Sequence, residues 1–231
     1  MPQRPRPSGR AGFCPRSADR AVCLDEKVGA YLHSGRITRH MDHFILALKT
    51  DPATDRPSFL LSLYWLAYEL AGGPGHLAYL FSDPAGTLPG TELVLTDDVA
   101  LAEALRARTR PFQWPPQDPD RPARLAEFER RPLRPFGFAW TIHASGTGGE
   151  PPVEIEARWE EIAPPVFASG PARGGNQIAT TLADARRATA RVNGVDIPGA
   201  PFPNAIWHPW FGRTDTGSCV AGLGEAIYEP I

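Results

Sequence analysis

Lysine is nearly absent from this chain of 231 residues, in which Lys27 and Lys49 are the only lysines among 24 basic residues. A Schiff-base enzyme would therefore have two candidate lysines, and neither lies in a recognisable motif. No run of 18 apolar residues occurs, so we expect no membrane-spanning helix. The net charge of −2 gives no basic surface for nucleic acid or anionic lipid, and neither is expected as a partner.

Cysteine is also scarce. The three cysteines, Cys14, Cys23 and Cys219, form an odd set without metal-type spacing, which argues against a secreted disulfide scaffold and a zinc knuckle. We expect free thiols. Residues 1–20 are basic with no apolar stretch behind them, so we predict a disordered tail rather than a signal peptide, and a cytoplasmic protein.

Aromatic residues and proline, in contrast, are plentiful. Six Trp, eleven Phe and five Tyr, within 42% hydrophobic residues, are enough for a sizeable core. The 26 prolines predict short regular elements and many loops, because proline breaks helix interiors and cannot donate to a sheet.

Beyond residue 20 the dominant hydrophobic period is two, which is typical of strands. Residues 38–49 place Asp42, Phe44, Leu46 and Leu48 on one face. Residues 58–70 are apolar on both faces, which predicts a strand covered on two sides, with a buried helix as the alternative. Residues 152–162 alternate between apolar and charged side chains, and Asn193-Gly194 is a strong hairpin signal. Further strands are expected at 76–81, 136–144, 177–192, 205–212 and 219–229.

Two helices are expected among these strands. Asp97 or Asp98 can cap a helix over residues 97–108, with Val99, Leu101, Ala102 and Leu105 as its apolar stripe. Residues 109–123 are rich in proline and predict an irregular loop, followed by a short helix over 123–130. The fold class is therefore mainly β: an antiparallel barrel with one or two inserted helices, forming one domain over residues 21–231.

The common cofactor and nucleophile motifs fail. The residues around Ser218 do not make a serine-hydrolase elbow. Gly222 and Gly224 lack the third glycine of a dinucleotide-binding loop. We therefore expect no cofactor.

His40-Met-Asp42-His43 is the one local cluster of histidine with a carboxylate. A cupin-like metal site would need a distant third ligand such as His143 or His208. The alternative is that these are ordinary polar residues at the start of a strand, and we expect no metal.

Four residues are candidates for acid/base chemistry. Asp42 would be a usable acid or base if its face lined an apolar cavity, because desolvation raises the pKa of a carboxyl. His208 is its candidate partner, and Tyr64 and Tyr68 are candidate donors to a developing oxyanion. The alternative for the tyrosines is simple packing, and for the Trp207–Trp210 segment a structural plug. Candidate substrate walls are Phe44, Trp65, Trp140, Trp159 and Trp210.

The last fifty residues carry a resemblance. An extended segment ATARVNGVDIPG ends in a glycine turn, and is followed by an aromatic strand WHPWFG and a closing strand GLGEAIYE. This layout resembles the lipocalin-like barrels that include carotenoid hydratases and natural-product cyclases. The resemblance implies an apolar ligand inside a barrel and acid/base chemistry without a cofactor, and it carries no site residue over to this chain.

We therefore expect an enzyme of bacterial small-molecule metabolism that binds an apolar substrate in a barrel. It would catalyse a hydration, dehydration, isomerisation or cyclisation. The alternatives are a non-enzymatic carrier of an apolar ligand, a cupin-like metalloenzyme using His40 and His43, and an interaction module. A homodimer is compatible with the sequence.

Overall fold

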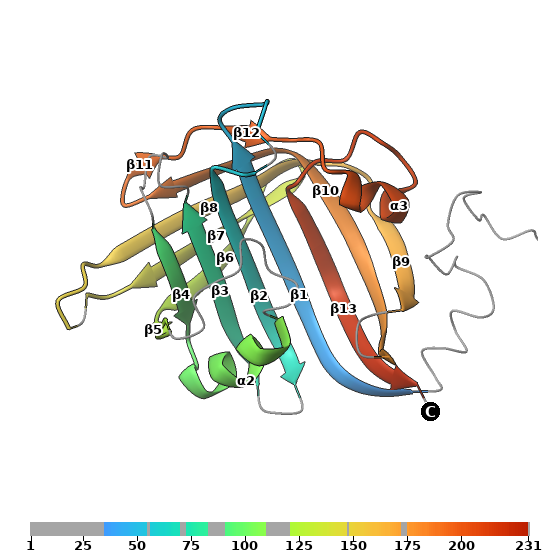
Figure 1. Ribbon diagram of the computed structural model, residues 1–231, viewed down its shortest axis with the longest axis horizontal. Coiled ribbons are helices and arrows are strands. Elements are labelled where there is room, and N and C mark those ends of the chain that lie inside the picture. The colour runs from blue at the N-terminus through green and yellow to red at the C-terminus, as the bar shows by residue number, and fades with distance from the viewer. Residues whose placement is uncertain are drawn as a thin grey trace, which may run out of the picture.

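The computed structural model describes residues 35–54, 56–69, 73–82, 91–109, 121–146, 148–171 and 175–230. The predicted tail over residues 1–20 lies outside this part. The described chain is mainly β (Figure 1). Its elements are β1 (Gly35–Lys49), β2 (Phe59–Glu69), β3 (Gly75–Ser82), β4 (Glu92–Thr96), α2 (Val99–Thr109), β5 (Arg124–Leu125), β6 (Glu127–Leu133), β7 (Gly137–Ala144), β8 (Val153–Ile162), β9 (Val166–Pro171), β10 (Gln177–Val192), β11 (Val195–Asp196), β12 (Ala200–Pro201), η3 (Ala205–Trp207), α3 (His208–Phe211) and β13 (Val220–Pro230).

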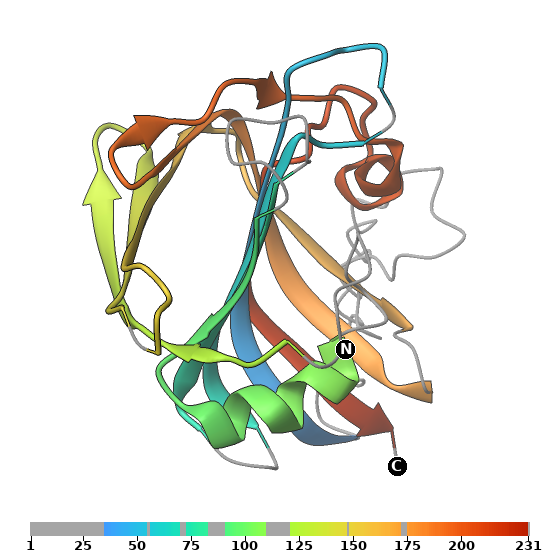
Figure 2. The same ribbon diagram turned by 60° about the vertical axis from the view of Figure 1, so that its left-hand side comes forward.

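The strands form a nearly closed barrel (Figure 2). Hydrogen-bonded neighbours follow the order β5-β4-β3-β2-β1-β13-β10-β8-β7-β6. The two ends of this path, β5 and β6, are separated in the chain by Ala126 alone, so the backbone itself joins them. The prediction of a purely antiparallel barrel is wrong in one place, because β4 and β5 pair in parallel. The mainly β class and the barrel are confirmed.

Strand β10 changes partners along its length. The second half of β10 pairs with β8, and its first half pairs with β9 along the same edge and with β13 along the other. Pro164 and Pro165 separate β8 from β9, because proline cannot donate to the ladder. As a result β9, β10, β13 and β1 extend the sheet beyond the barrel proper (Figure 1).

The barrel interior holds the main hydrophobic core. The ring of Phe44 makes edge contacts with those of Phe138, Trp140 and Trp159, at centroid distances of 5.1, 5.4 and 5.9 Å. Trp159 is fully buried, and its Nε1 donates to the backbone oxygen of Ile45 at 2.9 Å. The faces predicted for residues 38–49 and 152–162 are confirmed, as is the strand rather than helix over 58–70.

Helix α2 covers the outer face of β2 and β3 (Figure 2). Its cap is confirmed, since Asp98 Oδ1 accepts from the backbone N–H of Leu101 at 3.1 Å. Leu101, Ala102 and Leu105 are buried as predicted. Val99 was expected in the same stripe but is 43% exposed, because it stands in the first turn at the outer side of the helix.

The predicted strand over residues 205–212 is wrong. This segment forms the 3₁₀ turn η3 and the short helix α3. Asn204 accepts from the N–H of Ile206, and Pro209 stands in the first turn of α3, where a missing N–H costs no hydrogen bond. Phe211 packs against Leu182 and Val220, which fixes the segment on the outer face of β10 and β13.

The predicted helix over residues 123–130 is also wrong, because this segment forms β5 and the start of β6. Pairing of Glu127–Leu133 with β7 supplies the hydrogen bonds that a helix would have made internally, so tertiary pairing overrides local propensity.

The predicted hairpin at Asn193-Gly194 is confirmed. Both residues have positive φ, 49° and 77°, as a tight hairpin turn requires, and they join β10 to β11. Among the described helices, none is long and apolar enough to span a bilayer.

Candidate functional site

A pocket of about 320 Å³ lies on the outer face of the sheet, not inside the barrel. It occupies the space between two outer hydrophobic clusters. One is the cluster under α2, which includes Met41 and Tyr64, and the other is the cluster under α3, which includes Leu182 and Val220. We call this cavity the outer pocket. Its size is at the lower end of small-molecule sites.

The walls of the outer pocket are mainly apolar. Trp207 and Trp210 both line it, because residues three apart on a helical segment lie on the same side. On a strand these two residues would have pointed to opposite faces. The strand side of the wall is formed by aliphatic residues of β1, β10 and β13: Met41, Ile45, Ile178, Leu182, Val220 and Ile227.

Glu225 is the one carboxylate among the described residues that line the outer pocket, and a β-bulge in β13 orients its side chain toward the pocket. Val220 and Gly222 line the pocket while Ala221 lies in the barrel core, as expected for alternation. The register then shifts, and Glu225 and Ile227 line the pocket instead of Ala226. Without this shift Glu225 would have pointed toward the barrel interior.

The bulge is held by Asp42 and Gly224. Gly224 has φ 59°, a left-handed conformation that glycine adopts without strain. Its backbone N–H donates to Asp42 Oδ1 at 2.8 Å, and Arg130 Nη1 lies 3.3 Å from Asp42 Oδ2. Asp42, the candidate acid/base residue, therefore lies on the inner face of β1, away from the outer pocket, and fixes the backbone that aims Glu225.

Burial changes the chemistry of Glu225. The residue is 8% exposed, and desolvation raises the pKa of its carboxyl to about 7. The charge of Arg39 opposes this rise, and that of Asp42 adds to it. A carboxyl with this pKa exists in both its acid and base forms near neutral pH, as a proton-transfer catalyst requires.

His43 stays neutral beside it. Its ring stacks on that of Tyr64 at a centroid distance of 4.0 Å, and its Nε2 lies 2.9 Å from Ser62 Oγ. Burial lowers the pKa of His43 to about 3. The pocket therefore contains a neutral imidazole rather than a second cation at this point.

The candidate site residues are thus divided between two faces. Tyr64 and Trp210 lie in the outer pocket. Asp42 and the three aromatic residues Phe44, Trp140 and Trp159 lie inside the barrel. Trp65 is 36% exposed on β2. His208 does not line the outer pocket, and its buried Nε2 has no hydrogen-bond partner among the described residues. The Tyr68 side chain lies outside the described part.

A second polar arrangement lies toward one end of the barrel core. His76 Nδ1 is 2.6 Å from Asp97 Oδ2, and the His76 ring stacks on Phe128 at 4.7 Å. The Trp140 ring meets His76 edge-on at 5.5 Å, and its buried Nε1 has no partner within the described ranges. A carboxylate that orients an imidazole is a common acid/base arrangement. The sequence does not indicate this pair, because the two residues stand 21 positions apart.

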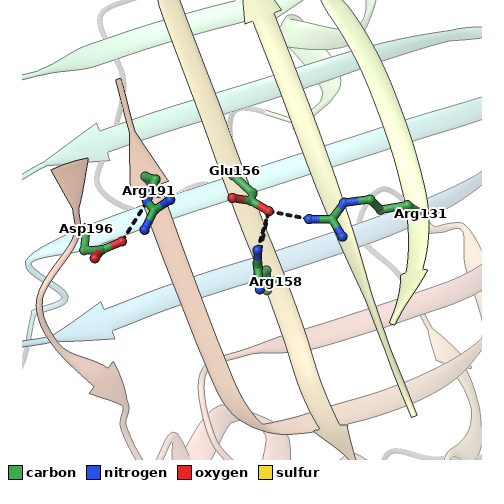
Figure 3. A network of polar contacts seen from close by, with 5 residues as sticks. All are labelled: Arg131, Glu156, Arg158, Arg191 and Asp196. Atoms are coloured by element: carbon green, nitrogen blue, oxygen red, sulfur yellow. Dashed lines mark hydrogen bonds and ion pairs between the residues drawn. The ribbon is translucent and has the colours of Figure 1, made fainter. Parts of the chain in front are cut away.

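The outer barrel surface carries a network of charges (Figure 3). Glu156 accepts from Arg131 and Arg158, which lower the pKa of its carboxyl, and Arg191 pairs with Asp196 at 2.8 Å. Every charge of this network has an opposite partner. A hollow of about 270 Å³ adjoins the network. Exposed ion pairs of this kind contribute little to stability, and we assign no binding function to the hollow.

The cupin-like alternative has no structural support in the described residues. They bring together no group of three histidine, cysteine or carboxylate side chains that could hold a metal ion. His43 contacts Ser62, and His40 is exposed on the opposite face of β1.

Sequence reasoning missed Glu225, His43 and Thr180 as pocket residues. A signal for the first was present: two glycines inside an otherwise regular strand, Gly222 and Gly224, often mark a bulge. A bulge reverses the faces of all later residues, which would have turned Glu225 outward.

Comparison with known proteins adds no assignment, since no family model, curated protein or solved structure matches this chain.

Proposed function

We propose that this protein is an enzyme that binds a mainly apolar small molecule in the outer pocket and catalyses a proton transfer on it. Glu225 is the acid/base group of the proposal, and hydration, dehydration, isomerisation and cyclisation are the reaction types it serves. The observation that carries the proposal is a buried carboxyl, with a pKa of about 7, in a mainly apolar pocket.

The volume sets the size of the ligand. One water molecule takes about 30 Å³ in the liquid, so a cavity of about 320 Å³ has the volume of roughly eleven waters, which suits a small bicyclic molecule. The aromatic faces of Trp207 and Trp210 suit a ring system. A lipocalin-like origin of the barrel is part of the same proposal, supported by the Asn193-Gly194 hairpin and the closing strand β13 but not by the helical segment between them. The ligand of the proposal lies outside the barrel wall.

Deuterium exchange into 2-tetralone, a bicyclic ketone of this size, tests the proposal. Ionised Glu225 would remove the proton next to the carbonyl, and solvent deuterium would return to that carbon. The protein should accelerate this exchange above the buffer rate, with a rate that rises with pH around a midpoint near 7.

Glu225→Gln should abolish the acceleration. Glu229→Gln, which changes an exposed carboxylate of the same strand, is the matched control and should leave it unchanged. If the ketone binds without accelerated exchange, the protein is a carrier. If Glu225→Gln exchanges as fast as the wild type, another group is the base.

A further inference from the structure

Glu225 and Thr180 lie on either side of Gly222 in the outer pocket, and we call the space over this glycine the seat. A Cβ atom on Gly222 would lie 3.2 Å from Glu225 Oε2 and 3.3 Å from Thr180 Oγ1. A Cβ there would be in tight contact with both oxygen atoms, so glycine at this position leaves their shared side open to a ligand bound in the pocket.

Thr180 is an incomplete hydrogen-bonding group. It is 3% exposed, and its Oγ1 has no hydrogen-bond partner among the described residues. A buried hydroxyl without a partner costs roughly 1–3 kcal/mol, so such groups commonly await a ligand or water. Thr180 lines the outer pocket, which makes a ligand atom the natural partner.

The charges around the seat select the ligand class. Arg39 lines the same pocket and disfavours a second cation, whereas ionised Glu225 disfavours a second anion. The remaining titratable groups that line the pocket are His43 and Tyr64. Burial keeps His43 neutral, so this group does not change the balance at neutral pH.

We infer that the ligand of the outer pocket is a neutral apolar alcohol, whose hydroxyl occupies the seat above Gly222, donating to Glu225 and accepting from Thr180. This inference deepens the proposed function and rests on it. A hydroxyl suits the seat better than a carbonyl, because it both donates and accepts. The hydrocarbon part lies against Trp207 and Trp210.

Four probes with one bicyclic skeleton test the inference: tetralin, 2-tetralol, 2-aminotetralin and tetralin-2-carboxylate. Their dissociation constants are measured by NMR titration at pH 8. We expect 2-tetralol to bind about threefold to tenfold more tightly than tetralin, as one net hydrogen bond provides. The two charged probes should bind more weakly than 2-tetralol.

Two variants locate the hydroxyl. Thr180→Val keeps the shape and removes the hydroxyl, and Gly222→Ala places a methyl group in the seat. Both should bring the ratio of the two dissociation constants close to one while tetralin still binds. Thr189→Val on the exposed face of the same strand β10 is the matched control and should keep the wild-type ratio.

The outcomes separate the two proposals. If tetralin and 2-tetralol bind equally, if a charged probe binds best, or if Thr180→Val keeps the ratio, the hydroxyl seat is overturned and the apolar pocket stands. If the ratio depends on Thr180 but 2-tetralone shows no exchange, the seat stands and the proposed catalysis is overturned. If no probe binds, both are overturned.

Discussion

Replacing Glu225 by glutamine should stabilise the protein at alkaline pH and change its stability little at acid pH. The pKa of this carboxyl is raised from 4.5 to about 7 by burial, so the folded state holds the proton more tightly than the unfolded state. The resulting stabilisation is fully present below pH 4.5 and is lost as the pH rises through about 7.

The magnitude follows from the shift. Each pKa unit corresponds to about 1.4 kcal/mol, so a shift from 4.5 to about 7 is worth about 3 kcal/mol. Glutamine imitates the protonated carboxyl and has no proton to lose. The variant should therefore gain about 3 kcal/mol over the wild type between pH 4 and pH 8, or roughly 6–12 °C in Tm for a domain of this size.

Urea denaturation of both proteins across this pH range measures the difference directly. His43 has the opposite linkage: its pKa is lowered to about 3, so it costs stability as the pH falls below 6.5. Since His43 is present in both proteins, its contribution cancels in the difference. Glu229→Gln should show almost no pH-dependent difference, because Glu229 pairs with Arg36 at the exposed surface. Parallel stability curves for the wild type and Glu225→Gln would refute the reasoning.

Three further changes test other parts of the structure. Asp42→Ala should lower the free energy of unfolding, measured by urea denaturation, by about 2–3 kcal/mol, because Gly224 N–H loses its acceptor and Arg130 its partner. The same variant should exchange 2-tetralone more slowly, and an unchanged exchange rate would contradict the positioning role of Asp42. Trp159→Phe should cost about 2–3 kcal/mol in the same assay, because the oxygen of Ile45 loses its donor and a cavity remains. Burial raises the pKa of Cys219 to about 12, so in a variant without the two N-terminal cysteines a thiol reagent should react only with the unfolded protein. Rapid labelling of the native form would show that Cys219 is accessible.

Much of the barrel could be predicted from alternation alone. Where a strand has one core face and one polar face, as in β8, burial dictates both its structure and its orientation. The Asn193-Gly194 hairpin follows from local backbone preference, which needs no tertiary information.

The site could not be predicted in the same way, because its position depends on two departures from alternation. The bulge at Gly224 reverses the faces of β13, and the helical turn over residues 205–211 places Trp207 beside Trp210. Asp42 lies on the face of β1 predicted for it, with Phe44 and Leu46, but this face borders the barrel interior and not the outer pocket. The hydrogen-bond partners of Asp42 are the N–H of Gly224 and the guanidinium of Arg130, which stand 182 and 88 positions away in the chain.

Strand β1 separates the outer pocket from the barrel interior and contributes side chains to both. Its odd-numbered side chains from Arg39 to Ile45 border the outer pocket, and even-numbered ones such as Phe44 and Leu46 fill the barrel. Mutagenesis restricted to the odd positions would thus diversify ligand preference while leaving the scaffold's interior packing untouched. For the same reason, natural substitutions at the odd-numbered positions can change which ligand the outer pocket binds while the barrel core stays as it is.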